Sequence, residues 1–172
     1  YNFDGLDELY ETAVQLPDVD RHEVYAHHTG DDEWEEVPYR DSLWTNDGRA
    51  TGVVSSSDEF YNIIQYGDIL ETVGDAVDRH DDITPSGQVS VSPTAHKMSA
   101  DIDFNGATVY ASQDDPIDLG LHVRSGHSGF HGLKYDVGAE RLVCSNGMTS
   151  FISELSFDQI LSGQFQPGLA YN

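Results

Sequence analysis

Acidic residues are spread along this whole chain and are not gathered in a tail. Its 172 residues include 31 Asp and Glu against 8 Lys and Arg, which gives a formal net charge of −23 at pH 7. Such a chain repels itself in dilute buffer, whereas salt at about 1 M screens charges beyond roughly 3 Å. The fold must therefore keep its carboxylates solvated. We predict a salt-rich halophile cytoplasm as its location, with K⁺ or other salt ions at its surface.

The length and the aromatic content predict one globular domain over residues 1–172. Nine Tyr, seven Phe and two Trp supply large side chains for a single core. No segment approaches the roughly 20 apolar residues of a membrane span, and the first residues lack the basic and apolar regions of a signal peptide. Cys144 is the only cysteine, so an internal disulfide and a cysteine zinc cage are excluded. We predict no membrane association, and oligomerisation stays open.

Apolar periodicity and turn residues predict an α+β fold. Helical spacing is expected over 6–16, with Asp4 as N-cap and Pro17 as stop, and again over 69–80. Hairpins are expected from 23–28 with 34–39, and from 42–45 with 51–55. Segment 60–65 is β-like, and the loop 81–88 is a possible internal boundary. We expect Asn105-Gly106 to close a hairpin, with further strands at 119–125, 130–136 and 140–144. The sum is a mostly antiparallel sheet built from hairpins, with two or three helices packed on it.

Two stretches carry a resemblance to a known family. Residues 37–73 read VPYRDSLWTNDGRATGVVSSSDEFYNIIQYGDILETV, and residues 124–148 read RSGHSGFHGLKYDVGAERLVCSNGM. Over roughly 37–148 the chain resembles the phage/plasmid-like protein family, a domain of unknown function numbered 932. The resemblance implies a mobile-element accessory protein serving replication, recombination or defence evasion, and it implies no particular activity.

The resemblance also marks individual positions. The family's histidine, cysteine and asparagine fall on His127, Cys144 and Asn146. Ser128 stands where the family has an aspartate, and Met148 stands near a position where the family tends to have a hydroxyl residue. The resemblance therefore implies no role that needs this aspartate.

Three histidines are candidate metal ligands. Neutral imidazoles bind zinc and other transition metals, and His122, His127 and His131 would meet if they converged at one end of a hairpin. They would point apart if strand alternation separates them. No cysteine joins them, so we favour structural or exposed histidines, and a metal-dependent enzyme at this site is the second alternative function.

Catalytic motifs are otherwise weak. There is no nucleophile elbow and no glycine-rich phosphate loop, and the clustered aspartates are typical of the surface of so acidic a chain. We predict no catalytic residue and no cofactor.

One group of cations stands out in this acidic chain. Arg124, Lys134 and Arg141 lie on or beside neighbouring expected strands, with Phe130 and Tyr135 among them. A sheet with cations and aromatics can hold single-stranded nucleic acid by phosphate contacts and base stacking. The alternative is that each cation pairs with a nearby carboxylate. We predict a non-catalytic accessory protein that acts through nucleic acid or a nucleic-acid-processing partner; the first alternative is an acidic protein-interaction or DNA-mimicking module.

Overall fold

The computed structural model describes residues 1–30, 32–57, 59–112 and 115–139, and this part of the chain forms two antiparallel sheets and two helices. The α+β expectation is confirmed in this form. The elements are β1 (Asn2–Asp4), α1 (Leu6–Gln15), β2 (Val19–His27), β3 (Trp34–Thr45), β4 (Ala50–Ser55), α2 (Tyr66–Asp78), β5 (Thr84–Val91), β6 (Lys97–Ser112), β7 (Asp115–Gly126) and β8 (Lys134–Ala139).

The larger sheet has five strands in the order β1-β5-β6-β7-β8, and its two faces differ. Strand alternation sends one set of side chains to the helices and the other set away from them. On the helix side, one cross-strand row joins Val89, Ala100, Val123 and Tyr135. The opposite face carries polar residues at the intervening positions, and we call it the open face.

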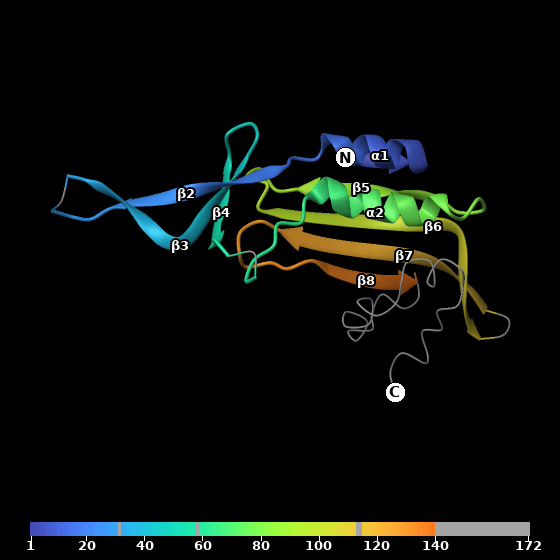
Figure 1. The fold of residues 1–172 in the computed structure, drawn as a ribbon. Coiled ribbons are helices and arrows are strands. Elements are labelled where there is room, and N and C mark those ends of the chain that lie inside the picture. Colours follow the sequence, from blue (N-terminus) through green and yellow to red (C-terminus); the bar gives the residue numbers. More distant parts are fainter. Residues whose placement is uncertain (31, 58, 113–114, 140–172) are drawn as a thin grey trace.

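Both helices cover the helix side of the five-stranded sheet (Figure 1). They approach each other closely at Gly74, where an added Cβ would lie 2.8 Å from the Tyr10 ring. The Tyr10 hydroxyl donates a hydrogen bond to Asp75 across the pair. Gly74 lowers the helix propensity of α2, and the same residue permits this contact. The main core of the described residues lies between the helices and this sheet.

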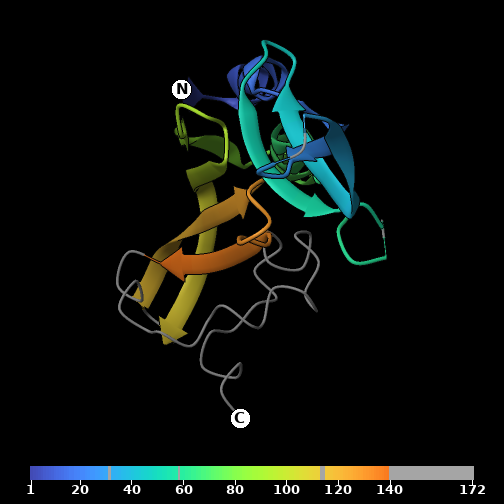
Figure 2. The ribbon, with the colours of Figure 1, turned by 90° about the vertical axis from the view of Figure 1, so that its left-hand side faces the viewer.

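The smaller sheet has the order β2-β3-β4 and a small core of Val19, Leu43 and Val54. Its β2–β3 hairpin extends away from the rest of the molecule in Figure 1 and points toward the viewer in Figure 2. Both hairpins expected in this region are confirmed, and β3 is one strand that takes part in both. Segments 34–39 and 42–45 are thus parts of the same strand, in which Tyr39 has a φ of 64°.

Two expectations about local structure are wrong. In segment 60–65 no strand forms; the Gln65 side chain instead donates to the Val19 carbonyl and accepts from the Val19 amide, at 2.9 and 3.0 Å. Most of segment 81–88 belongs to strand β5, which begins at Thr84. Pro85 is tolerated in this strand because it lies beyond the last residue of β5 that pairs with β1. The Pro85 carbonyl accepts from Gly5 at 2.8 Å, and the absent amide would face the same edge, where no ladder partner follows.

The predicted hairpin at Asn105-Gly106 is also wrong. Strand β6 continues through it, with a register shift between Phe104 and Thr108 in its pairing with β7. Gly106 has a φ of 97°, and an added Cβ would lie 2.1 Å from the Asp82 carbonyl oxygen. The dipeptide therefore forms a bulge. The sequence did not distinguish the two structures, because a glycine supplies left-handed backbone in a turn and in a bulge alike.

The start of α1 differs from the expectation in a similar way. Asp4 belongs to β1, and Gly5 is the N-cap with a φ of 101°. The Asp4 amide donates to the Glu8 carboxylate at 2.8 Å, so an acidic side chain in the first turn satisfies a backbone donor. Among the described residues, neither helix is long and apolar enough to cross a membrane.

Candidate functional site

A row of polar side chains crosses the open face at one end of the five-stranded sheet. Ser90 pairs with Ser99, Ser99 with Arg124, and Arg124 with Lys134, so the four residues share one face. Beyond this row, Lys97 lies on the same face, two residues before Ser99. The pairing of four strands, β5 to β8, therefore brings together hydroxyls and cations that are far apart in sequence.

The β7–β8 loop, residues 127–133, covers the end of this row. The smaller sheet holds the first part of the loop: a Cβ on Gly52 would lie 2.5 Å from the Ser128 Cα, and one on Gly129 would lie 2.9 Å from the Val53 carbonyl oxygen. The second part folds back over Gly126, where an added Cβ would lie 2.8 Å from the His131 Cβ. Two glycines on strands and one in the loop thus permit a close approach that positions Phe130 and His131.

The row and the loop line a pocket of about 490 Å³ that is open to solvent on one side. Its polar and aromatic lining consists of Ser90, Ser92, Ser99, Ser125, Lys97, Arg124, Lys134, His131 and Phe130. Three of the chain's eight basic residues, including both lysines, therefore line one pocket. The Phe130 side chain is 90% exposed at this site. Cations, hydroxyl donors and an accessible aromatic face are the groups that bind phosphate and a base.

The three cations of the pocket differ in whether they already have a hydrogen-bond or ion-pair partner. Arg124 donates to the Asp136 carboxylate at 2.9 Å, and its side chain is half exposed. Neither the Lys97 nor the Lys134 ammonium has a hydrogen bond or ion pair with another described residue. Local pairing, the alternative considered for Arg124, Lys134 and Arg141, therefore applies to Arg124 and not to Lys134 within the described part, and Arg141 lies outside it.

The next row of the open face is acidic. It runs through Gln88, Asp101, His122 and Asp136. The His122 Nδ1 lies 2.5 Å from the Asp101 carboxylate. Asp103 follows on the same face, two residues after Asp101. Among the described residues of this face, Lys and Arg therefore lie only at the end of the sheet that holds the pocket.

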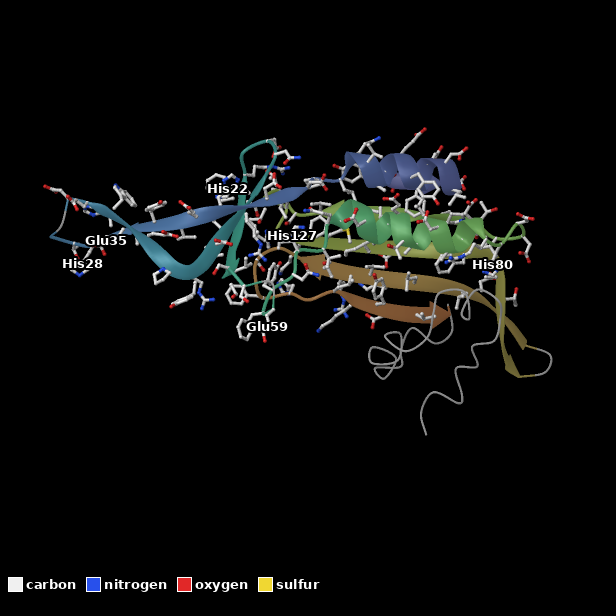
Figure 3. All side chains as sticks on the ribbon, in the orientation of Figure 1. His22, His28, Glu35, Glu59, His80 and His127 are labelled. Carbon is white, nitrogen blue, oxygen red and sulfur yellow. The ribbon has the colours of Figure 1, made fainter. Side chains whose placement is uncertain are left out.

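His127 lies on the far side of this loop, between the two sheets. Its side chain is 1% exposed, and neither ring nitrogen has a hydrogen-bond partner among the described residues. The Thr51 hydroxyl donates to the His127 carbonyl at 3.4 Å, and the His127 amide donates to the His96 carbonyl at 3.0 Å. Burial lowers the pKa of His127 to about 4, because a charged imidazole would lose its hydration there. Figure 3 labels it where β4 approaches the β7–β8 end of the larger sheet.

The three candidate metal ligands do not gather. His122 is paired to Asp101 on the open face, His127 is buried between the sheets, and His131 packs over Gly126. Within the described ranges, no group of three His, Cys, Asp or Glu side chains is arranged to hold a metal ion. The second alternative function thus has no assembled site in this part of the chain.

The predicted nucleic-acid residues are only partly brought together. Arg124, Phe130 and Lys134 line the pocket, while Tyr135 is on the helix side and packs against the main core. Burial raises the pKa of the Tyr135 hydroxyl. Arg141, Cys144 and Asn146 lie outside the described residues. The alternation of neighbouring strand residues already indicated that Lys134 and Tyr135 face opposite sides.

Sequence reasoning missed Lys97 and the serines. Ser90 and Ser92 flank Val91, and Lys97 and Ser99 flank Met98, so each of the two segments has the alternation of a strand with one polar face. Nothing in that pattern says which strand lies beside β6. Pairing of β6 with β7 places Ser99 beside Arg124 and so completes the site.

No protein-family model, curated protein or solved structure matches this chain.

Proposed function

We propose that this chain binds single-stranded nucleic acid without catalysis, at the pocket lined by Lys97, Arg124, Lys134 and Phe130. The observation that carries the proposal is the convergence of both lysines on one pocket beside an exposed phenylalanine. In a chain with a net charge of −23, three cations around one pocket make a local positive region that favours an anionic ligand there. Phosphate oxygens suit the cations, and a base suits the Phe130 ring.

The proposed context is a salt-adapted cytoplasm. Affinity that rests on counterion release falls steeply with salt, so a protein working there depends more on stacking and on hydrogen bonds. Phe130 and the pocket serines are groups of this kind. The resemblance to the phage/plasmid-like family supports an accessory role in replication or recombination, and no cofactor is needed for it.

The proposal is tested by fluorescence anisotropy of labelled single- and double-stranded DNA and RNA in KCl on the order of 1–2 M. We expect saturable binding of single strands that weakens at least tenfold in Phe130→Ala and Lys134→Gln. Arg40→Gln is the matched control, because it removes one exposed cation from the smaller sheet, away from the pocket. Absence of binding to every probe by the folded protein would rule out the proposal, as would equal losses in the control.

A second candidate function rests on the projecting β2–β3 hairpin, which we call the arm. Residues 22–39 contain no Lys or Arg. The described acidic residues of this stretch are Glu23, Asp32, Glu33, Glu35 and Glu36. Tyr25, Trp34 and Tyr39 are large side chains exposed by 51, 67 and 83%. Carboxylates beside aromatic faces suit a basic peptide, since ammonium and guanidinium groups bind both.

This second candidate is tested with an arginine-rich peptide and Trp fluorescence. His27 and Trp34 rings lie 5.5 Å apart on the arm, and the second tryptophan, Trp44, is at its base. We expect the peptide to shift the Trp34 emission, and the double variant Glu35→Gln, Glu36→Gln to weaken the response. Retention of the full response in the double variant would contradict a role for the arm carboxylates.

A further inference from the structure

The charge pattern of the open face limits how a polynucleotide can lie on it. Lys97, Arg124 and Lys134 occupy the end of the sheet that the β7–β8 loop covers. One row further along, the face presents Asp101 and Asp136, and Asp103 follows. A strand lying across several rows would bring its phosphates against these carboxylates, which costs free energy even where salt screens part of the repulsion.

The pocket itself has the size and the donors for one nucleotide. A volume of about 490 Å³ lies within the roughly 300–1,000 Å³ of small-ligand sites. The Ser90 and Ser99 hydroxyls and two ammonium groups converge on it without a described partner. The Ser92 hydroxyl is already bonded, at 3.0 Å to the His96 Nδ1 and at 3.1 Å to the Lys97 amide. A phosphate monoester carries nearly two charges at pH 7 and presents three strong acceptor oxygens, so it uses more of these donors than a phosphodiester does.

From these observations we infer that the pocket takes the terminal phosphate of a strand, with the adjoining base on the exposed Phe130 ring. This inference rests on the proposed function and specifies its ligand as a nucleotide that ends in a phosphate monoester. Lys97 and Lys134 neutralise the monoester, Ser90 and Ser99 donate to its oxygens, and the acidic rows turn the rest of the strand away from the sheet. Arg124, already paired with Asp136, contributes less.

The experiment compares oligonucleotides of 2, 6 and 20 residues that carry a 5′-phosphate, a 3′-phosphate or neither, together with a mononucleotide. Binding is followed by anisotropy or calorimetry in KCl between about 0.5 and 2 M. We expect one of the phosphorylated ends to bind at least tenfold more tightly than the unphosphorylated strand, with little dependence on length. A mononucleotide that binds as tightly as the oligonucleotides also supports the inference, since the pocket then reads one nucleotide only.

Variants and salt dependence complete the test. Lys97→Gln and Lys134→Gln should remove the preference for a phosphorylated end, while Arg40→Gln retains it. For single strands the slope of log affinity against log salt is about −0.7 for each phosphate neutralised, so end binding predicts a shallow slope that is the same at 6 and 20 residues. Circular dichroism of each variant establishes that it is folded.

Two results separate this inference from the proposed function. Binding that strengthens with length and ignores the terminal phosphate overturns the inference and leaves nucleic-acid binding in place. A folded protein that binds none of the probes overturns both.

Discussion

The His127 ring stacks on the Tyr66 ring, with centroids 4.1 Å apart and an angle of 22° between the planes. Tyr66 begins α2, and its hydroxyl donates to the Ala95 carbonyl at 2.8 Å. The stack therefore connects the start of a helix to the first residue of the β7–β8 loop. The surroundings of His127 indicate that it supports this loop from the side away from the pocket.

The first prediction concerns pH. The pKa of His127 is about 4 in the folded protein against 6.5 ordinarily, so the unfolded chain binds this proton first as pH falls. The stability that depends on a neutral His127 is fully present above about pH 6.5 and is lost as the pH falls from there towards 4. The free energy of unfolding should drop by roughly 3 kcal/mol from this group. Denaturant unfolding in KCl at several pH values measures the drop.

The control for this prediction is His127→Phe, which retains a stacked ring and has no imidazole to titrate. Because neither ring nitrogen of His127 is hydrogen-bonded in the described part, the substitution should cost little stability at pH 7. Its pH dependence should be shallower than that of the wild type below pH 6.5. Parallel pH profiles for the two proteins would show that His127 does not carry the effect.

The second prediction concerns the contact that holds the loop. In Gly52→Ala the new Cβ would meet the Ser128 Cα at 2.5 Å and the His127 carbonyl oxygen at 2.6 Å. Both are backbone atoms, so the sheet and the loop must separate, at a cost of about 1–3 kcal/mol. Gly132→Ala in the same loop should be tolerated, since no heavy atom lies within 4 Å of its new Cβ. Thermal unfolding of the two variants compares them, and equal melting temperatures would contradict the role of Gly52.

The third prediction concerns the paired cation. Asp136→Asn removes a negative charge beside the pocket and weakens the 2.9 Å hydrogen bond from Arg124. We expect affinity for a phosphate-bearing ligand to rise several-fold, measured by the same anisotropy titration. Asp103→Asn is the control, because it removes the same charge further along the open face. Lower affinity in Asp136→Asn would mean that Asp136 positions Arg124 for binding.

The fourth prediction concerns the link between segment 60–65 and β2. The Gln65 side chain both donates to and accepts from the backbone of Val19. Gln65→Met retains the length and loses both hydrogen bonds, which leaves two partly buried backbone groups unsatisfied and should cost about 2 kcal/mol. Gln65→Glu retains only the acceptor and should fall between the two. Chemical denaturation ranks the three proteins, and a variant as stable as the wild type would contradict the link.

The fifth prediction concerns salt. With a net charge of −23, self-repulsion in the folded state should fall as KCl rises from 0.1 to 2 M, since the screening length shortens from about 10 Å to below 3 Å. The melting temperature should therefore rise steadily over this range. Unchanged melting temperatures would count against a salt-adapted protein.

The sequence predicted those parts of the fold that depend on neighbouring residues. Apolar spacing located both helices, and the turn at Asn46-Asp47-Gly48 joins β3 to β4 as expected. The predictions were wrong where one short sequence is compatible with two different local structures. Asn105-Gly106 suits a turn and a bulge equally, and Pro85 suits a loop and a strand beyond its paired edge.

Sequence alone determined the composition of each strand face, because alternation follows directly from the extended backbone. It also determined the charge that any surface of this protein must carry. Only the tertiary structure decided which strands are neighbours, and therefore that Ser99, Arg124 and Lys134 form one row. The loop over Gly126, which places Phe130 beside the lysines, depends on contacts with β4, some 75 residues earlier in the chain. Such contacts depend on how the two sheets pack together, and periodicity within a segment holds no information about that packing.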